Sequence, residues 1–110
     1  MKLYKFKLKP EEIKDLVTPI GYCLVSDKIT VDGLKVGFMY REKAEEKDDS
    51  GWRFLSGTES EEYLDNESNT MIFEVNVVAN YDASIIPYLK SKVGTELERV
   101  EGTDEFRPLS

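Results

Sequence analysis

With 110 residues, of which 40% are apolar and 11% aromatic, the chain is long enough for one compact core and too short for two. Its fifteen basic and twenty-two acidic residues give a net charge of −7, which disfavours binding to nucleic acid or to an anionic membrane. The chain has no long apolar run, no apolar stretch typical of a secretion signal, and one cysteine, which permits no internal disulfide. We therefore expect a cytoplasmic protein.

Residues 1–19 predict a strand followed by a short helix. Apolar side chains alternate with lysines over residues 4–9, a pattern typical of a strand at a sheet edge. Pro10 and the two acids after it are typical of a helix start, and Pro19 ends that helix. We expect residues 1–19 to be an extension that can vary and that packs as one unit with a domain formed by residues 20–110.

The rest of the chain predicts strands separated by turns and short polar segments. Residues 58–70 are polar and predict a helix or a loop. Asp82 is expected to cap a short helix, which Pro87 keeps short because it lacks an amide hydrogen. The predicted strands are residues 20–26, residues 29–31 and 36–40 as a hairpin around Asp32-Gly33, residues 52–55, residues 71–79 with a possible helical turn near Val77, and residues 95–100. Together these elements predict an α+β fold: a mostly antiparallel sheet of about five strands with one or two short helices.

The sequence lacks the residues that most common catalytic sites and metal sites require. The chain has no histidine, which removes the usual catalytic triads and most zinc sites. Cys23 lies in an apolar stretch and is expected to be a buried structural thiol. Residues 65–76 begin like a calcium loop but lack its sixth-position glycine and its final glutamate. We expect no cofactor, no metal and no catalysis; paired carboxylates leave a histidine-free enzyme as one alternative.

Negative charge is concentrated in the middle of the sequence. Residues 42–67 hold three basic and ten acidic residues, so their net charge of −7 equals that of the whole chain. A field of this sign attracts a basic partner and speeds its docking, although acidic surfaces also serve solubility alone.

The stretch DDSGWRFLSG, residues 48–57, contains the only tryptophan and allows two compatible interpretations. In the structural one, Trp52 and Phe54 fill the core, Asp49 bonds local amides in a turn, and Arg53 pairs with an acid. In the functional one, Trp52 and Arg53 lie at a recognition surface with an acidic rim. The residues predicted to bind a partner are Asp48, Asp49, Trp52, Arg53, Glu59, Glu61, Glu62, Tyr63 and Asp65.

Several motifs taken together resemble those of a bacterial protein family. They are S-D-x-I-x-x-D-G at 26–33, Y-R-E at 40–42, D-S-G-W-R-F-x-S-G at 49–57, N-Y-D at 80–82 and I-I-P at 85–87. Over residues 20–100 the chain resembles immunity proteins of the thirty-three type, from polymorphic-toxin systems. The resemblance implies a cytosolic protein that binds and neutralises a cognate toxin, often a nuclease, and it supplies no catalytic residue.

The sequence thus predicts a non-catalytic bacterial binding protein of the immunity type. Its acidic surface, spanning residues 42–67, would cover the basic cleft of a protein toxin. One alternative is a regulatory domain that binds a small molecule or peptide in a pocket around Trp52. Another is a domain whose tryptophan is purely structural. A monomer and a homodimer both remain open.

Overall fold

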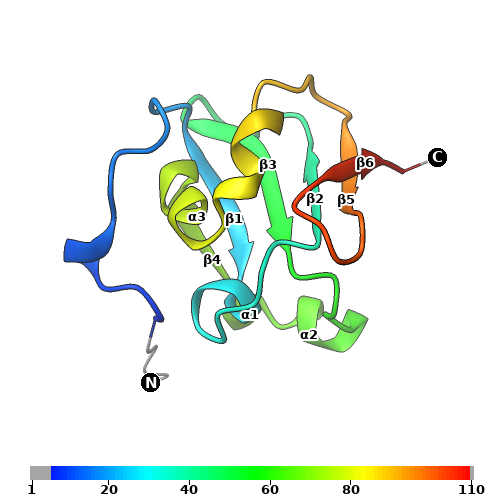
Figure 1. Ribbon diagram of the computed structural model, residues 1–110, viewed down its shortest axis with the longest axis horizontal. Coiled ribbons are helices and arrows are strands. Elements are labelled where there is room, and N and C mark those ends of the chain that lie inside the picture. The colour runs from blue at the N-terminus through cyan, green and yellow to red at the C-terminus, as the bar shows by residue number, and fades with distance from the viewer. Residues whose placement is uncertain (1–5, 110) are drawn as a thin grey trace.

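The computed structural model describes residues 6–109, and these residues form an α+β fold, as predicted (Figure 1). The strands are β1 (Tyr22–Ser26), β2 (Phe38–Arg41), β3 (Asp49–Leu55), β4 (Thr70–Glu74), β5 (Glu96–Arg99) and β6 (Phe106–Pro108). The α-helices are α1 (Asp27–Thr30), α2 (Glu61–Asp65) and α3 (Val75–Tyr81), and the 3₁₀ helices are η1 (Pro10–Glu12), η2 (Glu67–Asn69) and η3 (Ala83–Tyr88). No helix in this part of the chain has the length and apolarity needed to cross a membrane.

The six strands form one mixed sheet in the order β4-β1-β3-β2-β5-β6. Only β1 and β3 run parallel; every other neighbouring pair is antiparallel. β3 therefore lies inside the sheet, between β1 and β2, and it is buried along almost its whole length. This position explains why the DDSGWRFLSG stretch is more enclosed than an isolated strand would be.

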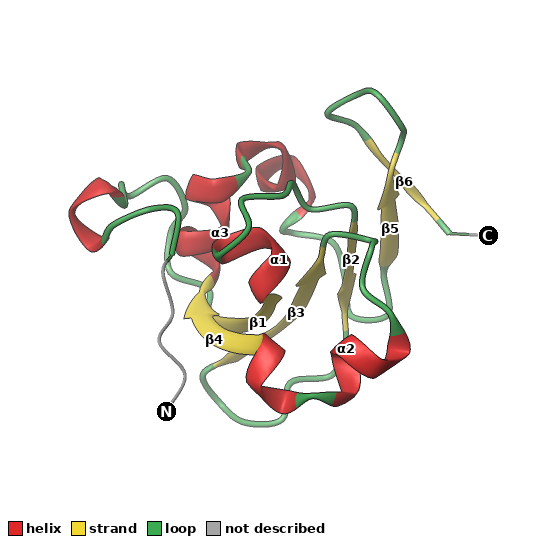
Figure 2. Cartoon of the chain, turned by 90° about the horizontal axis from the view of Figure 1, so that it is seen from below, coloured by secondary structure: helices red, strands yellow, loops and turns green. Residues whose placement is uncertain are grey.

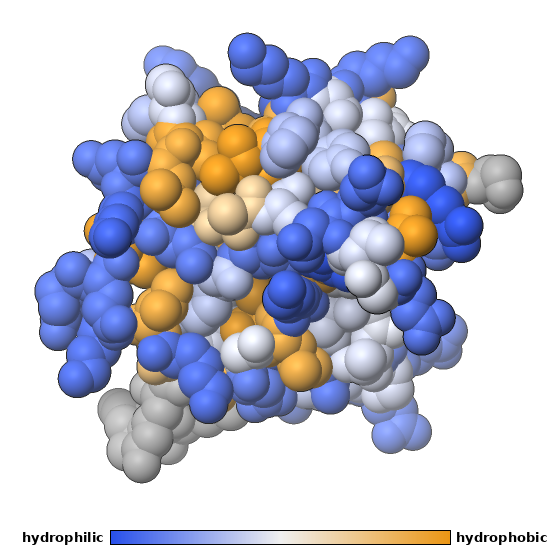
Figure 3. Space-filling model, in the orientation of Figure 1, coloured by the Kyte–Doolittle hydropathy of each residue, from blue (hydrophilic) through white to orange (hydrophobic). Residues whose placement is uncertain are grey.

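The hydrophobic core lies on one side of the sheet, where α1 and α3 pack against β1 (Figure 2). Trp52 is fully buried there, its ring stacked on Phe54 with the centroids 5.9 Å apart. Its indole Nε1 donates to the Leu89 carbonyl at 3.2 Å, so the one polar atom of the ring is satisfied. The outer surface on this side is hydrophilic between separate apolar patches (Figure 3).

Two predicted elements are wrong in the middle of the chain. The hairpin around Asp32-Gly33 is replaced by α1, because the Ser26 hydroxyl accepts from the Lys28 amide and caps a helix before the turn. The single strand over 71–79 is also wrong beyond Glu74, where α3 begins and carries the predicted helical turn near Val77. β6 was not expected, since three residues ending in Pro108 show no alternating pattern.

The N-terminal arm, residues 6–19, differs from its prediction. Residues 6–9 form no strand, and the rest of the predicted strand lies outside the described residues. The predicted helix is only the single turn η1. Side chains of α3 hold the segment extended: Asn76 Oδ1 accepts from the Leu16 and Val17 amides, and Asn80 Oδ1 accepts from the Lys14 amide. These bonds satisfy amides that a helix would otherwise pair internally.

Candidate functional site

A buried cluster of charges lies at the start of β3. Arg53, 3% exposed, donates from both terminal nitrogens to the Asp49 carboxylate, at 2.9 and 2.8 Å. Its Nε donates to Glu42 Oε2 at 2.6 Å. Asp49 also accepts from the Gly51 amide at 2.8 Å and from the Glu45 amide at 3.0 Å. One carboxylate therefore fixes both the guanidinium and the loop of residues 42–48 that leads into β3.

The electrostatics of this cluster favour its charged form. The bonds from the Arg53 guanidinium outweigh burial and hold the pKa of the Asp49 carboxyl well below its usual range. The two carboxylates in turn raise the pKa of Arg53 above its already high value. Neither group can act as an acid or a base near neutral pH, so the cluster is a structural ion pair.

Three of the predicted partner-binding residues are inside the fold. Trp52, Arg53 and Asp49 are 0%, 3% and 6% exposed, because β3 is an inner strand with side chains packed on both faces. So little of their surface is exposed that their role in binding a partner stays a prediction. Their surroundings match the structural interpretation of the motif: core aromatics, a turn bonded by Asp49, and an arginine paired with acids.

The exposed acids form two clusters rather than one surface. The first acidic cluster is Glu42, Glu45, Glu46 and Asp48, on the loop before β3. The second acidic cluster is Glu61, Glu62 and Asp65, on α2 after β3. The seven residues of β3 separate them by roughly 20 Å at about 3.3 Å per residue. The single acidic face expected over residues 42–67 is therefore divided between opposite ends of the central strand (Figure 1).

Glu59 and Tyr63 have local partners. Glu59 accepts from the Ser56 amide at 2.8 Å and from the Gly57 amide at 2.9 Å, and thereby closes the turn after β3. Burial raises the pKa of this carboxyl, but hydrogen bonds from Ser26 and Ser56 outweigh burial and lower it overall. The Lys28 ammonium lies 5.0 Å from the centre of the Tyr63 ring, a cation–π contact. Glu59 therefore shapes the loop and is half-buried, whereas Glu61 and Glu62 point into solvent.

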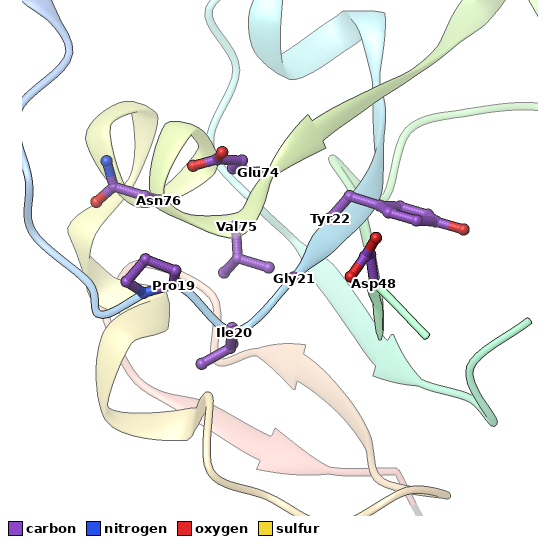
Figure 4. A pocket seen from close by; sticks show the side chains of 8 residues that line it. All are labelled: Pro19, Ile20, Gly21, Tyr22, Asp48, Glu74, Val75 and Asn76. Atoms are coloured by element: carbon purple, nitrogen blue, oxygen red, sulfur yellow. The ribbon is translucent and has the colours of Figure 1, made fainter. Parts of the chain in front are cut away.

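One apolar pocket of about 200 Å³ lies where the N-terminal arm meets β1 (Figure 4). Its lining residues are Pro19, Ile20, Gly21, Tyr22, Asp48, Glu74, Val75 and Asn76. The Tyr22 hydroxyl at its rim donates to Glu46 Oε1 at 2.7 Å, and this bond raises the pKa of Tyr22 to about 12. Within residues 6–109, no three His, Cys, Asp or Glu side chains are arranged to hold a metal ion.

The sequence reasoning missed the side chains on the sheet face opposite the core. Among them are Leu24, Tyr40 and Ile72, which come from three different strands. The signal that could have revealed them is the apolar character of both faces of β1, since Leu24 alternates with the buried Cys23 and Val25. A strand with one solvated face would carry polar residues there.

The comparisons with known proteins agree with the motifs. No curated protein and no solved structure matches the chain. The model of the immunity protein Imm33 domain matches residues 23–110, a range that contains β2 to β6, nearly all of β1 and both acidic clusters. The N-terminal arm lies outside that match. The chain therefore belongs to the Imm33 immunity protein domain family, the family that its motifs resemble.

Proposed function

We propose that this protein is a non-catalytic bacterial immunity protein of the cytoplasm that binds and neutralises a basic protein toxin through its acidic surfaces. Membership of the immunity protein family supports a toxin as the partner. The observation that carries the proposal for the acidic surface is the pair of exposed acidic clusters at the two ends of β3. Such an arrangement attracts a positively charged surface over a broad area.

Both clusters rest on segments that the fold holds in place. Asp49 accepts from the Glu45 amide and so fixes the loop that bears the first acidic cluster. The Ser60 hydroxyl accepts from the Tyr63 amide and caps α2, which bears the second acidic cluster. Carboxylates on ordered segments lose less entropy on binding than carboxylates on a mobile chain. This supports a role in recognition beyond solubility.

The second candidate function is binding of a small molecule, and the pocket that could serve it lies near Ile20 rather than around Trp52. Trp52 is fully buried and is not among the residues that line the apolar pocket near Ile20. The apolar pocket near Ile20 favours this candidate, but its volume of about 200 Å³ is below the ~300–1,000 Å³ typical of ligand sites. A fragment screen by NMR would support it if shifts clustered at Pro19 and Ile20 in the absence of any protein partner.

The proposal is tested by affinity capture from the lysate of the source bacterium, at low and at high salt. We expect one basic protein that is retained at low salt and released at high salt, and that is toxic when expressed alone. The triple variant Glu61→Lys, Glu62→Lys, Asp65→Lys should lower its association rate constant about tenfold and change its dissociation rate little.

The matched control reverses three exposed acids elsewhere, in Glu11→Lys, Glu101→Lys, Glu105→Lys, and changes the net charge by the same amount. Equal slowing by both triple variants would show that only total charge matters and would refute the second acidic cluster as a binding surface. Failure to capture a toxic protein at either salt concentration would refute the proposed function.

A further inference from the structure

The sheet face opposite α1 and α3, called here the open face, carries apolar side chains on both sides of the buried Arg53. The strand register places its residues together. Leu24 of β1 pairs with Ile72 of β4, and Phe38 of β2 pairs with Leu55 of β3. Tyr40 lies two residues from Phe38 on the same strand, and their ring centroids are 5.5 Å apart. Four strands thus contribute apolar side chains to this face, and Arg53 lies between Leu24 and Tyr40 in the register.

The two faces of the sheet differ in how well they are covered. Against the helices, side chains such as Val25, Met39 and Phe54 are fully buried. On the open face, Leu24, Phe38, Tyr40 and Leu55 are only half-buried, and Ile72 is 62% exposed. A sheet face in contact with water normally carries polar side chains, because residues along each strand alternate between apolar and polar. Apolar side chains gathered on a surface mark an interaction site.

Acidic side chains surround these apolar residues. Glu74 pairs with Tyr22 at one edge and Glu96 pairs with Tyr40 on the far side, so both belong to the open face, and both are exposed. The first acidic cluster lies beyond one end of the face, before β3, whereas α2 with the second acidic cluster lies on this side of the sheet, where Leu64 lines a groove with Phe38 and Leu55 (Figure 2). The basic group at its middle, Arg53, is already neutralised by two carboxylates. The open face therefore has apolar side chains around a neutralised Arg53, with an acidic rim.

We propose that the open face is the surface that docks the toxin, and that the toxin presents apolar side chains ringed by lysines and arginines. This inference rests on the proposed function and places the toxin between the two acidic clusters. Charge complementarity selects this occupant: a second copy of the chain would bring two acidic rims together, each on a molecule of net charge −7. Apolar side chains within a charged rim are typical of protein–protein interfaces.

The test compares Ile72→Ser with Val93→Ser. Ile72 lies on the open face, whereas Val93 lies outside the sheet, and both are exposed β-branched side chains, at 62% and 56%. The probe is the protein recovered by the salt-dependent capture, titrated by calorimetry. Ile72→Ser should raise its Kd about tenfold or more, as the loss of an interface anchor does, while Val93→Ser leaves Kd within about twofold. Amides of β4 should also gain protection from hydrogen exchange in the wild-type complex.

Each outcome decides between the two proposals. If the wild type binds and neutralises the captured protein but Ile72→Ser binds it equally well, the proposal that the open face docks the toxin is refuted, and the proposed function stands. If the wild type captures no toxin, the proposed function fails and the docking surface fails with it. If sedimentation shows a wild-type dimer that Ile72→Ser dissociates, the occupant is a second copy and the inference is overturned. Because Ile72 is exposed, the variant should keep wild-type urea stability, which confirms that it folds.

Discussion

Removing the charge of Asp49 should destabilise the protein more than any other single isosteric change near β3. The carboxylate accepts four hydrogen bonds, two from Arg53 and one each from the Gly51 and Glu45 amides. In Asp49→Asn the guanidinium stays buried with Glu42 as its one acidic partner. Breaking a buried pair in this way costs about 3–5 kcal/mol, a large part of the ~5–15 kcal/mol that stabilises a typical domain.

The assay is urea unfolding, followed by the fluorescence of the buried Trp52 and by circular dichroism. For a slope of about 2 kcal/mol per molar urea, the midpoint should fall by roughly 1.5–2.5 M. Asp48→Asn is the matched control, since Asp48 is an exposed neighbour, and its change should stay within about 0.5 kcal/mol. A loss below about 1 kcal/mol for Asp49→Asn would refute the view that this ion pair secures β3.

The same carboxylate makes the stability depend on pH in a defined direction. Its folded-state pKa is lowered by Arg53, so its contribution is fully present above the unfolded value of about 3.9 and is lost as the pH falls through the lower folded value. Wild type should therefore lose stability below about pH 4 more steeply than Asp49→Asn. Parallel pH profiles for the two proteins would contradict this assignment.

Three further results are expected. The Cys23 thiol is fully buried, and burial raises its pKa. It should therefore resist a thiol reagent at pH 8 until urea unfolds the chain. Rapid labelling of the native protein would contradict its buried position. Gly51→Ala should cost more than about 2 kcal/mol in urea unfolding, because φ is +86° there and a methyl group would meet a backbone oxygen at 2.2 Å; an unchanged midpoint would be inconsistent with this turn. Asn76→Ala with Asn80→Ala should speed hydrogen exchange of the residue 14–17 amides without unfolding the sheet, whereas unchanged exchange would show that other contacts hold the arm.

Local signals in the sequence were sufficient for the elements that local chemistry controls. The apolar run that ends at Ser26 predicted β1, and the alternation of Trp52 and Phe54 predicted most of β3. Asp82 predicted the start of η3, where its side chain accepts from the Ser84 amide. In each case the signal lies within a few residues of the element that it specifies.

The misses have non-local causes or competing local signals. Asp32-Gly33 is a strong hairpin signal, but the Ser26 cap upstream directs the chain into α1 instead. The arm is extended because Asn76 and Asn80 bind its backbone from about 60 positions away in the sequence. No local pattern could show that interaction.

The structure gives the residues predicted to bind a partner surroundings that the sequence does not show. Trp52 and Arg53 are buried because β3 is an inner strand that pairs with β1 in parallel. The length of β3 separates the acids between its two ends, and its parallel pairing with β1 aligns Leu24 with Arg53 across the open face. Only the strand order, which sequence periodicity does not encode, reveals that arrangement.

The most direct test of the account is a growth assay in which the captured basic protein is expressed alone, with this protein, and with its Ile72→Ser and Val93→Ser variants. The account predicts growth arrest with the captured protein alone, and full rescue by wild type and Val93→Ser. It predicts weakened rescue by Ile72→Ser at equal expression. Growth arrest that wild type cannot relieve would contradict the central claim that this chain neutralises a toxin.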